Sequence, residues 1–323
     1  MENGTHSFYF NFSIFVNIGY YRYPAFVFCL LLFGFIVSAN LVIIVVISRE
    51  RTLHEPMYVF IAFLSVNALF GSAGFFPRFL MDVLSDTHLI SQPACFTQIY
   101  VIYSYAFCEV TILGIMSYDR YIAVCQPLHY HNKMTPKTVS KLAAFAWICP
   151  AFYLSVTIYV TIKIPLCGNK IDKVYCASWN VVKLSCVSTA LTQILATIGA
   201  IIVAFLPVSC IFYSYLRIVI VCWKSSSEFK GKVLQSCLPH IISMVIYCVT
   251  SFSDTVLDRY NHQGLNRFVV IILSLEFVVI PPALNPLLYG LKLPEIRTHI
   301  FRMLSLKRVS GKCSVTHIVV GKS

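Results

Sequence analysis

Long apolar runs alternate with short polar segments along the whole chain. Seven of these runs reach or approach the length of about 20 residues that a helix needs to cross the hydrocarbon core of a bilayer. Only helices satisfy their own backbone hydrogen bonds inside lipid, and the runs are too long for barrel strands. The pattern therefore predicts an all-α fold, a bundle of seven transmembrane helices. The predicted spans are residues 24–48, 57–80, 94–118, 142–162, 187–222, 233–257 and 268–291.

The spans divide the chain into three parts. Residues 1–23 are predicted to form an extracellular tail, residues 24–291 the bundle, and residues 292–323 a cytoplasmic tail that starts with a short amphipathic helix. With the N-terminus outside, the inner segments carry seventeen Lys and Arg residues and the outer segments carry seven. Because basic residues are retained on the cytoplasmic side, this asymmetry predicts an outer N-terminus and an inner C-terminus. We expect a multi-pass protein of the plasma membrane.

Composition agrees with a membrane protein and changes how the net charge is interpreted. The chain is 58% hydrophobic and 12% charged, about half the charged fraction of a soluble domain. Its net charge of +12 is explained by cytoplasmic basic residues, so nucleic-acid binding is not predicted. The leading segment lacks the basic start of a signal peptide and holds two sequons, at Asn3 and Asn11. Both are predicted glycosylation sites, as expected for an outward-facing tail.

The third span has a polar residue at each end that fixes its position in the membrane. Cys95 and Arg120 are 25 residues apart, which corresponds to about 37 Å of helix. Cys95 is therefore placed at the outer mouth, and the pair Asp119–Arg120 at the inner mouth. One interpretation of this pair is an interfacial anchor. The other is a latch, in which Arg120 leaves Asp119 to meet a cytoplasmic partner. Spacing alone leaves both interpretations open.

Five short motifs resemble the odorant receptors, a branch of the rhodopsin-like G-protein-coupled receptors. They occur in the family's order, and the resemblance covers about residues 20–305. The motifs are MSYDRYIAVCQPLHY (Met116–Tyr130), LHEPMY (Leu53–Tyr58), SYLRI (Ser214–Ile218), KVLQSCLPHI (Lys232–Ile241) and PPALNPLLYG (Pro281–Gly290). Asp-Arg-Tyr alone would be weak, but the full set in this order is a specific signal.

The resemblance implies a coupling switch at the inner side of the bundle. Tyr289 is expected to swing toward Tyr215 and Arg120 on activation, although Pro286 alone would also give a static kink. His240 is expected in a polar network that holds the sixth helix closed against Arg120. The implied switch residues are Asp119, Arg120, Tyr121, Tyr215, His240, Asn285, Pro286 and Tyr289.

Asn40 is a polar residue inside the first span. A buried amide in a lipid-embedded bundle needs hydrogen-bond partners, so it ties helices together. In the family this position braces the second and seventh helices. The alternative is an amide that bonds only within its own helix.

Glu109 is the only acid inside the third span. Odorant receptors carry a glutamate here that can share a sodium ion with an aspartate of the second helix. That position is Ala68 in this chain, with Asn67 beside it. Glu109 is expected either to hold a cation with help from Asn67, Ser117 or Asn285, or to be protonated. Protonation is slightly favoured, because burial disfavours the charged form, and no metal or other cofactor is assigned.

Four of the thirteen cysteines are placed on the outer side: Cys95, Cys167, Cys176 and Cys186. The outside is oxidising, so disulfides are expected, and four cysteines allow three pairings. Zinc binding is the alternative, but the spacing lacks CxxC pairs. The resemblance implies the pairs Cys95–Cys176 and Cys167–Cys186, the first of which would hold the second outer loop over the pocket.

A ligand pocket is expected between the outer halves of helices three, five, six and seven. Tyr103, Ala106 and Phe107 lie two to three turns below Cys95 and favour an apolar or mixed small ligand. Ile102 stands where amine receptors place an aspartate, which argues against an aminergic receptor. Arg259 is a candidate clamp for an anionic group. The alternative is an exposed arginine paired with Asp258.

Together, these features predict an olfactory, chemosensory G-protein-coupled receptor. A small odorant would bind from the outer side and activate a heterotrimeric G protein, by resemblance the stimulatory olfactory type. The alternative within the same fold is a peptide or lipid receptor. A channel or transporter would need a polar path across several spans, and the mid-membrane acids are few. No enzyme is predicted, because no nucleophile–base pair appears.

Overall fold

A computed structural model of the chain describes residues 9–15, 19–259 and 266–303. Seven helices in this part are long and apolar enough to cross a membrane, and they confirm the seven predicted spans. Six spans are single helices, and the fifth joins α7, a π-helical segment (Ala200–Phe205) and α8. The helices are α1 (Arg22–Arg49), α2 (Pro56–Leu84), α3 (Gln92–Cys125), α5 (Pro136–Ile162), α7 (Ala190–Gly199), α8 (Leu206–Trp223), α9 (Ser227–Arg259) and α10 (Arg267–Lys292).

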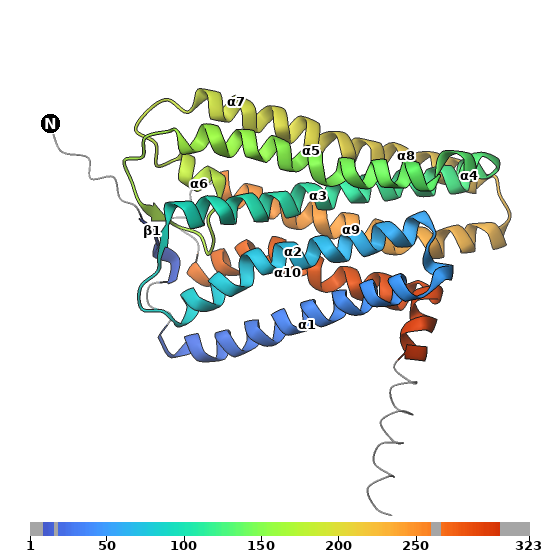
Figure 1. Cartoon of the computed structure of the whole chain (residues 1–323), viewed down its shortest axis with the longest axis horizontal. Coiled ribbons are helices and arrows are strands. Elements are labelled where there is room, and N and C mark those ends of the chain that lie inside the picture. Colours follow the sequence, from blue (N-terminus) through green and yellow to red (C-terminus); the bar gives the residue numbers. More distant parts are fainter. Residues whose placement is uncertain (1–8, 16–18, 260–265, 304–323) are drawn as a thin grey trace, which may run out of the picture.

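The third span, α3, lies at the centre of the bundle. It packs against α2, α5, α8 and α9, and it is the most buried of the seven spans (Figure 1). A glycine allows α2 to approach it closely, because a Cβ atom at Gly71 would lie only 2.5 Å from the ring of Tyr105. Small residues permit such close contacts between membrane helices. Residues of α3 are therefore within reach of most of the bundle.

A small three-stranded sheet closes the outer end of the bundle and departs from the predicted all-α fold. Strand β1 (Tyr9–Phe12) lies between β2 (Leu89–Ser91), with which it is antiparallel, and β3 (Lys170–Ile171), with which it is parallel. Phe10 and Phe12 alternate inward and are buried. The N-terminal segment is thus bound to both the first and the second outer loops. Figure 1 shows this sheet and the short α6 (Ser178–Val182) at the same end.

The inner end carries the helical turn α4 (Tyr130–Lys133) and a helix over residues 294–303. In the latter, Ile296 is buried and Ile300 and Met303 pack against the core, whereas Phe301 and Arg302 are exposed. This segment confirms the predicted amphipathic helix after the seventh span (Figure 1). Short 3₁₀ turns complete the connections, at Ser13–Phe15, Gly19–Tyr21, Arg51–Leu53 and Pro127–His129.

Candidate functional site

A cavity of about 320 Å³ lies between the outer halves of the helices. The predicted Tyr103, Ala106 and Phe107 all line it. Residues of α5, α7, α9 and α10 complete the wall together with α6 of the second outer loop, so the fourth span contributes as well as those expected. Arg259 is the last residue of α9, and its side chain lies outside the described part of the chain.

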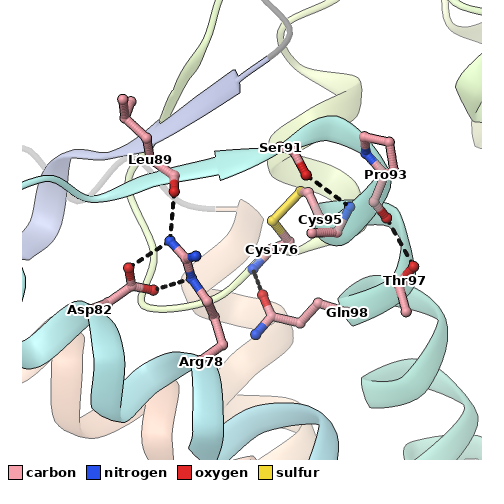
Figure 2. The surroundings of a disulfide bond; sticks show 10 residues. Arg78, Asp82, Leu89, Ser91, Pro93, Cys95, Thr97, Gln98 and Cys176 are labelled. Carbon is pink, nitrogen blue, oxygen red and sulfur yellow. Dashed lines mark hydrogen bonds and ion pairs between the residues drawn. A yellow bond between two sulfur atoms is a disulfide. The ribbon is translucent and has the colours of Figure 1, made fainter.

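Two disulfides fix the loop that covers this cavity. Cys95 is bonded to Cys176, and Cys167 to Cys186, as the resemblance implies, so these four cysteines are not available for zinc. Figure 2 shows the first bond at the start of α3, where the backbone N–H of Cys176 donates to Gln98 at 3.0 Å. The loop is therefore bound to the third helix by a covalent bond and by a hydrogen bond.

The outer end of α2 is joined to the sheet beside this disulfide. Arg78 binds the carboxylate of Asp82 with two hydrogen bonds, of 2.8 and 2.7 Å, and also donates to the backbone carbonyl of Leu89 at 2.7 Å (Figure 2). A bidentate guanidinium–carboxylate pair has a fixed geometry. It holds β2, and with it the N-terminal strand, against the bundle.

A buried lysine joins the covering loop to the sixth span. The ammonium group of Lys173 is fully buried and lies 2.6 Å from Oδ1 of Asp254 and 2.9 Å from Oδ1 of Asp258. Tyr175 donates to the same oxygen of Asp254 at 2.9 Å. Burial, with Asp254 nearby, raises the pKa of the Tyr175 phenol well above its ordinary value, so it stays a neutral donor. The loop thus forms a charged contact with α9.

Asn40 connects the first and seventh spans. Its side-chain N–H group donates to the carbonyl of Ile36 in its own helix at 2.8 Å and to that of Pro282 in α10 at 3.0 Å. Asn40 therefore bonds within its own helix and also ties that helix to the seventh span. Within the described residues, no hydrogen bond of Asn40 reaches the second helix.

Glu109 is buried at the middle of the bundle between two amides. Asn67 of α2 donates to one carboxylate oxygen at 2.8 Å, and Asn285 of α10 donates to the other at 2.6 Å. Ser243 of α9 in turn donates to Asn285 at 2.7 Å, whereas Ser117 bonds to the carbonyl of Gly114. Asn67 thus takes up the contact to the second helix that Ala68 cannot make. The described residues contain no group of three or more His, Cys, Asp or Glu suited to a metal ion.

At the inner mouth, Arg120 is held by its neighbour and by the sixth span. It donates to Asp119 at 3.0 and 2.6 Å and to the hydroxyl of Ser236 in α9 at 3.0 Å. Tyr130 donates to the other oxygen of Asp119 at 2.9 Å. Burial, with Asp119 nearby, raises the pKa of Tyr130, which therefore remains a donor. The acid–base pair thus contacts α4 and α9, and release of Arg120 as a latch stays a prediction.

His240 links three helices through its two ring nitrogens. Nε2 lies 3.0 Å from the carbonyl of Leu113 in α3, and Nδ1 lies 2.5 Å from the hydroxyl of Tyr215 in α8. Because a carbonyl only accepts, Nε2 carries the proton, and a neutral ring then accepts from Tyr215 at Nδ1. The predicted inner network is present. However, the sixth span contacts Arg120 through Ser236, one turn before His240.

The remaining predicted residues lie at both ends of the bundle. Tyr289 is buried and lies one turn after Pro286 in α10, and Tyr121 accepts a hydrogen bond from Gln126 at 3.1 Å. Asn11 is half-buried in the central strand β1. Asn3 lies outside the described residues. Glycosylation at Asn3 and Asn11 stays a prediction.

Three contributors are not apparent from the sequence: Lys173, Tyr175 and Ser236. Lys173 sits in a loop among other lysines, and only the folded loop distinguishes it as buried. Ser236 lies within a quoted motif, but a single serine gives no signal of its partner. The sequence places Asp254 and Asp258 near the outer end of the sixth span, although it does not show that they belong to the cavity wall.

Both the sequence and the fold of this chain are similar to those of known proteins. The family described as "Olfactory receptor" matches residues 28–307. Olfactory receptor 10A5 of Homo sapiens is 34% identical over 269 residues, covering 82% of this chain and 83% of the relative. Olfactory receptor 4B13 of Mus musculus is 32% identical over 262 residues, covering 81% and 84%. The crystal structure of squid rhodopsin has a TM-score of 0.72 at 16% identity, covering 87% of this chain and 80% of that chain, which supports the fold.

Proposed function

We propose, because this chain belongs to the olfactory receptor family, that its odorant binds in the 320 Å³ cavity under the second outer loop. The protein is a multi-pass G-protein-coupled receptor of the plasma membrane and not an enzyme. It binds small odorants and activates a heterotrimeric G protein. Ligand binding is assigned to residues at the outer side of the bundle, and coupling to residues at the inner side.

The single observation that best supports the ligand site is the composition and cover of the cavity. Its wall includes aromatic side chains of α3, α5, α6, α9 and α10, which suit a small and largely apolar molecule. The disulfide Cys95–Cys176 holds the loop across its outer end. A small covered cavity suits an odorant better than a peptide, whose chain needs an open groove.

The inner contacts of α9 supply a two-state element for coupling. In this structure Arg120 donates a hydrogen bond to Ser236 of α9, and His240 of α9 donates to the carbonyl of Leu113 in α3. An outward movement of α9 would break both contacts and free Arg120 for a cytoplasmic partner. A ligand shifts such an equilibrium only through contacts that differ between the two states. Tyr247 of α9 lines the cavity and donates to the carbonyl of Ala106 at 2.9 Å, so ligand contacts act directly on the moving helix.

Glu109 stands at the position of the family's sodium-sharing glutamate, and we propose that it acts here through direct contacts with two amides. Glu109 accepts one hydrogen bond at each carboxylate oxygen, from α2 and from α10. These hydrogen bonds connect α2, α3 and α10 at mid-membrane. They provide a fixed point about which the inner half of α10 can move. Pro286, one residue after Asn285, removes a backbone donor at this position and weakens the helix locally.

The partner is proposed to be the stimulatory olfactory type of G protein, so activation raises cAMP. The test is a cAMP assay in cells that express the receptor, with an odorant panel and with surface staining. Arg120→Ala is expected to abolish the odorant response at equal surface level. A full response in Arg120→Ala would refute the coupling role of Arg120. A calcium response in place of cAMP would refute the stimulatory type.

A further inference from the structure

The charges on the wall of the cavity are of one sign. Among the described residues that line it, Asp254 and Asp258 are the only ones that carry a formal charge at neutral pH. Both belong to α9 and lie one helical turn apart on the same face. Both are more than nine-tenths buried. A ligand in this cavity therefore meets carboxylates and no lining cation within the described part of the chain.

Lys173 compensates only one of these two charges. Its ammonium group reaches Oδ1 of both carboxylates, at 2.6 and 2.9 Å, but it is fully buried behind them and does not line the cavity. One ammonium between two carboxylates leaves one negative charge. Buried charges are stable when each is paired. The described residues, which leave out the side chain of Arg259, thus supply one cation for two carboxylates.

Lys183 also has its ammonium group near Asp258, but Lys183 does not line the cavity. It donates to the backbone carbonyl of Asp258 at 2.9 Å, and its side chain lies on the exposed side of the loop. Charges exposed to solvent are strongly screened by water and salt. Lys183 therefore weakens the negative potential from outside, and no Lys or Arg of the described residues lines the cavity beside the two carboxylates.

The rest of the wall suits the body of an amine. Aromatic rings surround the space below the carboxylates, and ring faces attract cations while their edges and bodies bind hydrocarbon. Ser251 and Thr255 lie on the same helix as the carboxylates and also line the cavity. The lining rings are those of Tyr103, Phe107, Tyr153, Trp179, Tyr247 and Phe277.

We propose that the ligand is a small protonated amine with a ring or branched hydrocarbon body, its ammonium group bound by Asp258 and Asp254. This inference rests on the proposed odorant site. Ile102 still means that α3 lacks the aspartate of amine receptors. In this cavity the carboxylates come from α9 instead of α3. The ammonium group is thus bound near the outer end of the cavity, and the body extends toward Tyr247 and Phe277.

The test uses three ligands with one carbon skeleton: 2-phenylethylamine, 2-phenylethanol and phenylacetic acid. The cAMP response is measured in cells with the full chain at known surface level. The amine is expected to act at a concentration at least about tenfold lower than the alcohol, and the acid to be weakest. Asp258→Asn is expected to raise the half-maximal concentration of the amine about tenfold or more and to change that of the alcohol little.

The matched control is Asp86→Asn, which removes an 89% exposed carboxylate from the outer face but not from the cavity. It is expected to leave the preference for the amine unchanged. The comparison of the three ligands is made on the unmodified receptor, so it decides the ligand class even if Asp258→Asn fails to reach the surface. A response to the acid or alcohol with none to the amine would overturn the amine assignment and leave the odorant site in place.

Binding is measured separately, as the thermal unfolding midpoint of the purified receptor in detergent with each ligand. Stabilisation by the amine, lost in Asp258→Asn, supports the inference without any G protein. Stabilisation without a cAMP response would refute the proposed coupling and keep the ligand class. Equal stabilisation of wild type and Asp258→Asn would overturn the carboxylate site. No effect of any of the three ligands in either assay would overturn the amine inference, whereas the odorant cavity itself is tested separately by Ala106→Phe.

Discussion

The side-chain amide of Asn40 donates to the backbone carbonyl of Pro282 at 3.0 Å. In a regular helix this carbonyl would accept from the N–H group four residues later. That residue is Pro286, which has no N–H group. Asn40 therefore satisfies an acceptor that the proline of the Asn-Pro-x-x-Tyr element leaves open, and it joins the first helix to the seventh one turn before that proline.

Asn40→Ala is expected to destabilise the receptor by about 1 kcal/mol, the usual size of a hydrogen bond between membrane helices. The measurement is thermal unfolding of the purified receptor. Ser38→Ala is the matched control, since Ser38 is exposed and its hydroxyl donates to the carbonyl of Gly34 in its own helix. In a Pro286→Ala background the carbonyl of Pro282 regains a backbone donor, so Asn40→Ala should cost less. Equal costs in both backgrounds would contradict this account.

Lys173→Met is expected to lower surface expression sharply. Without the ammonium group, Asp254 and Asp258 remain as two buried carboxylates, and breaking a buried ion pair costs about 3–5 kcal/mol. Surface staining of intact cells measures the effect. Lys170→Met removes an exposed lysine from the same loop and should change little.

The surface expression lost in Lys173→Met should be recovered by removing the two carboxylates as well. Adding Asp254→Asn and Asp258→Asn to Lys173→Met removes the unpaired charges and should restore much of the surface level. If the triple variant stays as low as the single one, Lys173 acts through something other than charge pairing.

Ser236→Ala is expected to raise cAMP in the absence of odorant. The variant removes the hydrogen bond from Arg120 to α9 but retains the pair Arg120–Asp119. A loss of about 1 kcal/mol from the closed state shifts the ratio of open to closed receptor about fivefold. Gln235→Ala changes the exposed neighbouring residue and should have no such effect. Unchanged basal cAMP in Ser236→Ala would remove this contact from the switch.

The helical framework was predictable because it depends on local properties. Apolar length sets each span, and the observed helices extend the predicted spans mainly at their ends, for example from 142–162 to Pro136–Ile162. Polar residues at those ends still continue the helix outside the hydrocarbon core. The outer sheet was not predictable, since its strands are only two to four residues long and pair between distant parts of the chain. Phe10 lies opposite Ile90, and Asn11 opposite Lys170.

The residues of the candidate site were predictable where their position along a helix is enough to place them in the bundle. Tyr103, Ala106 and Phe107 could be placed by counting from Cys95, and Glu109 by its isolation in an apolar span. Lys173 could not, because its position depends on how the disulfide-bonded loop folds over the cavity. Ser236 and His240 are one turn apart, and which of them meets Arg120 depends on the rotation of α9, which the sequence does not specify.

Odorant binding in the cavity is tested most directly by a cAMP dose–response curve for an active odorant on Ala106→Phe. Ala106 lines the cavity, so a phenyl ring at this position occupies the space proposed for the odorant. Ala106→Ser, which adds one hydroxyl, is the matched control, and both are compared with wild type at equal surface level. Ala106→Phe is expected to lose the response or to need at least about tenfold more odorant, and Ala106→Ser is expected to stay near wild type. An unchanged curve for Ala106→Phe would contradict binding in this cavity.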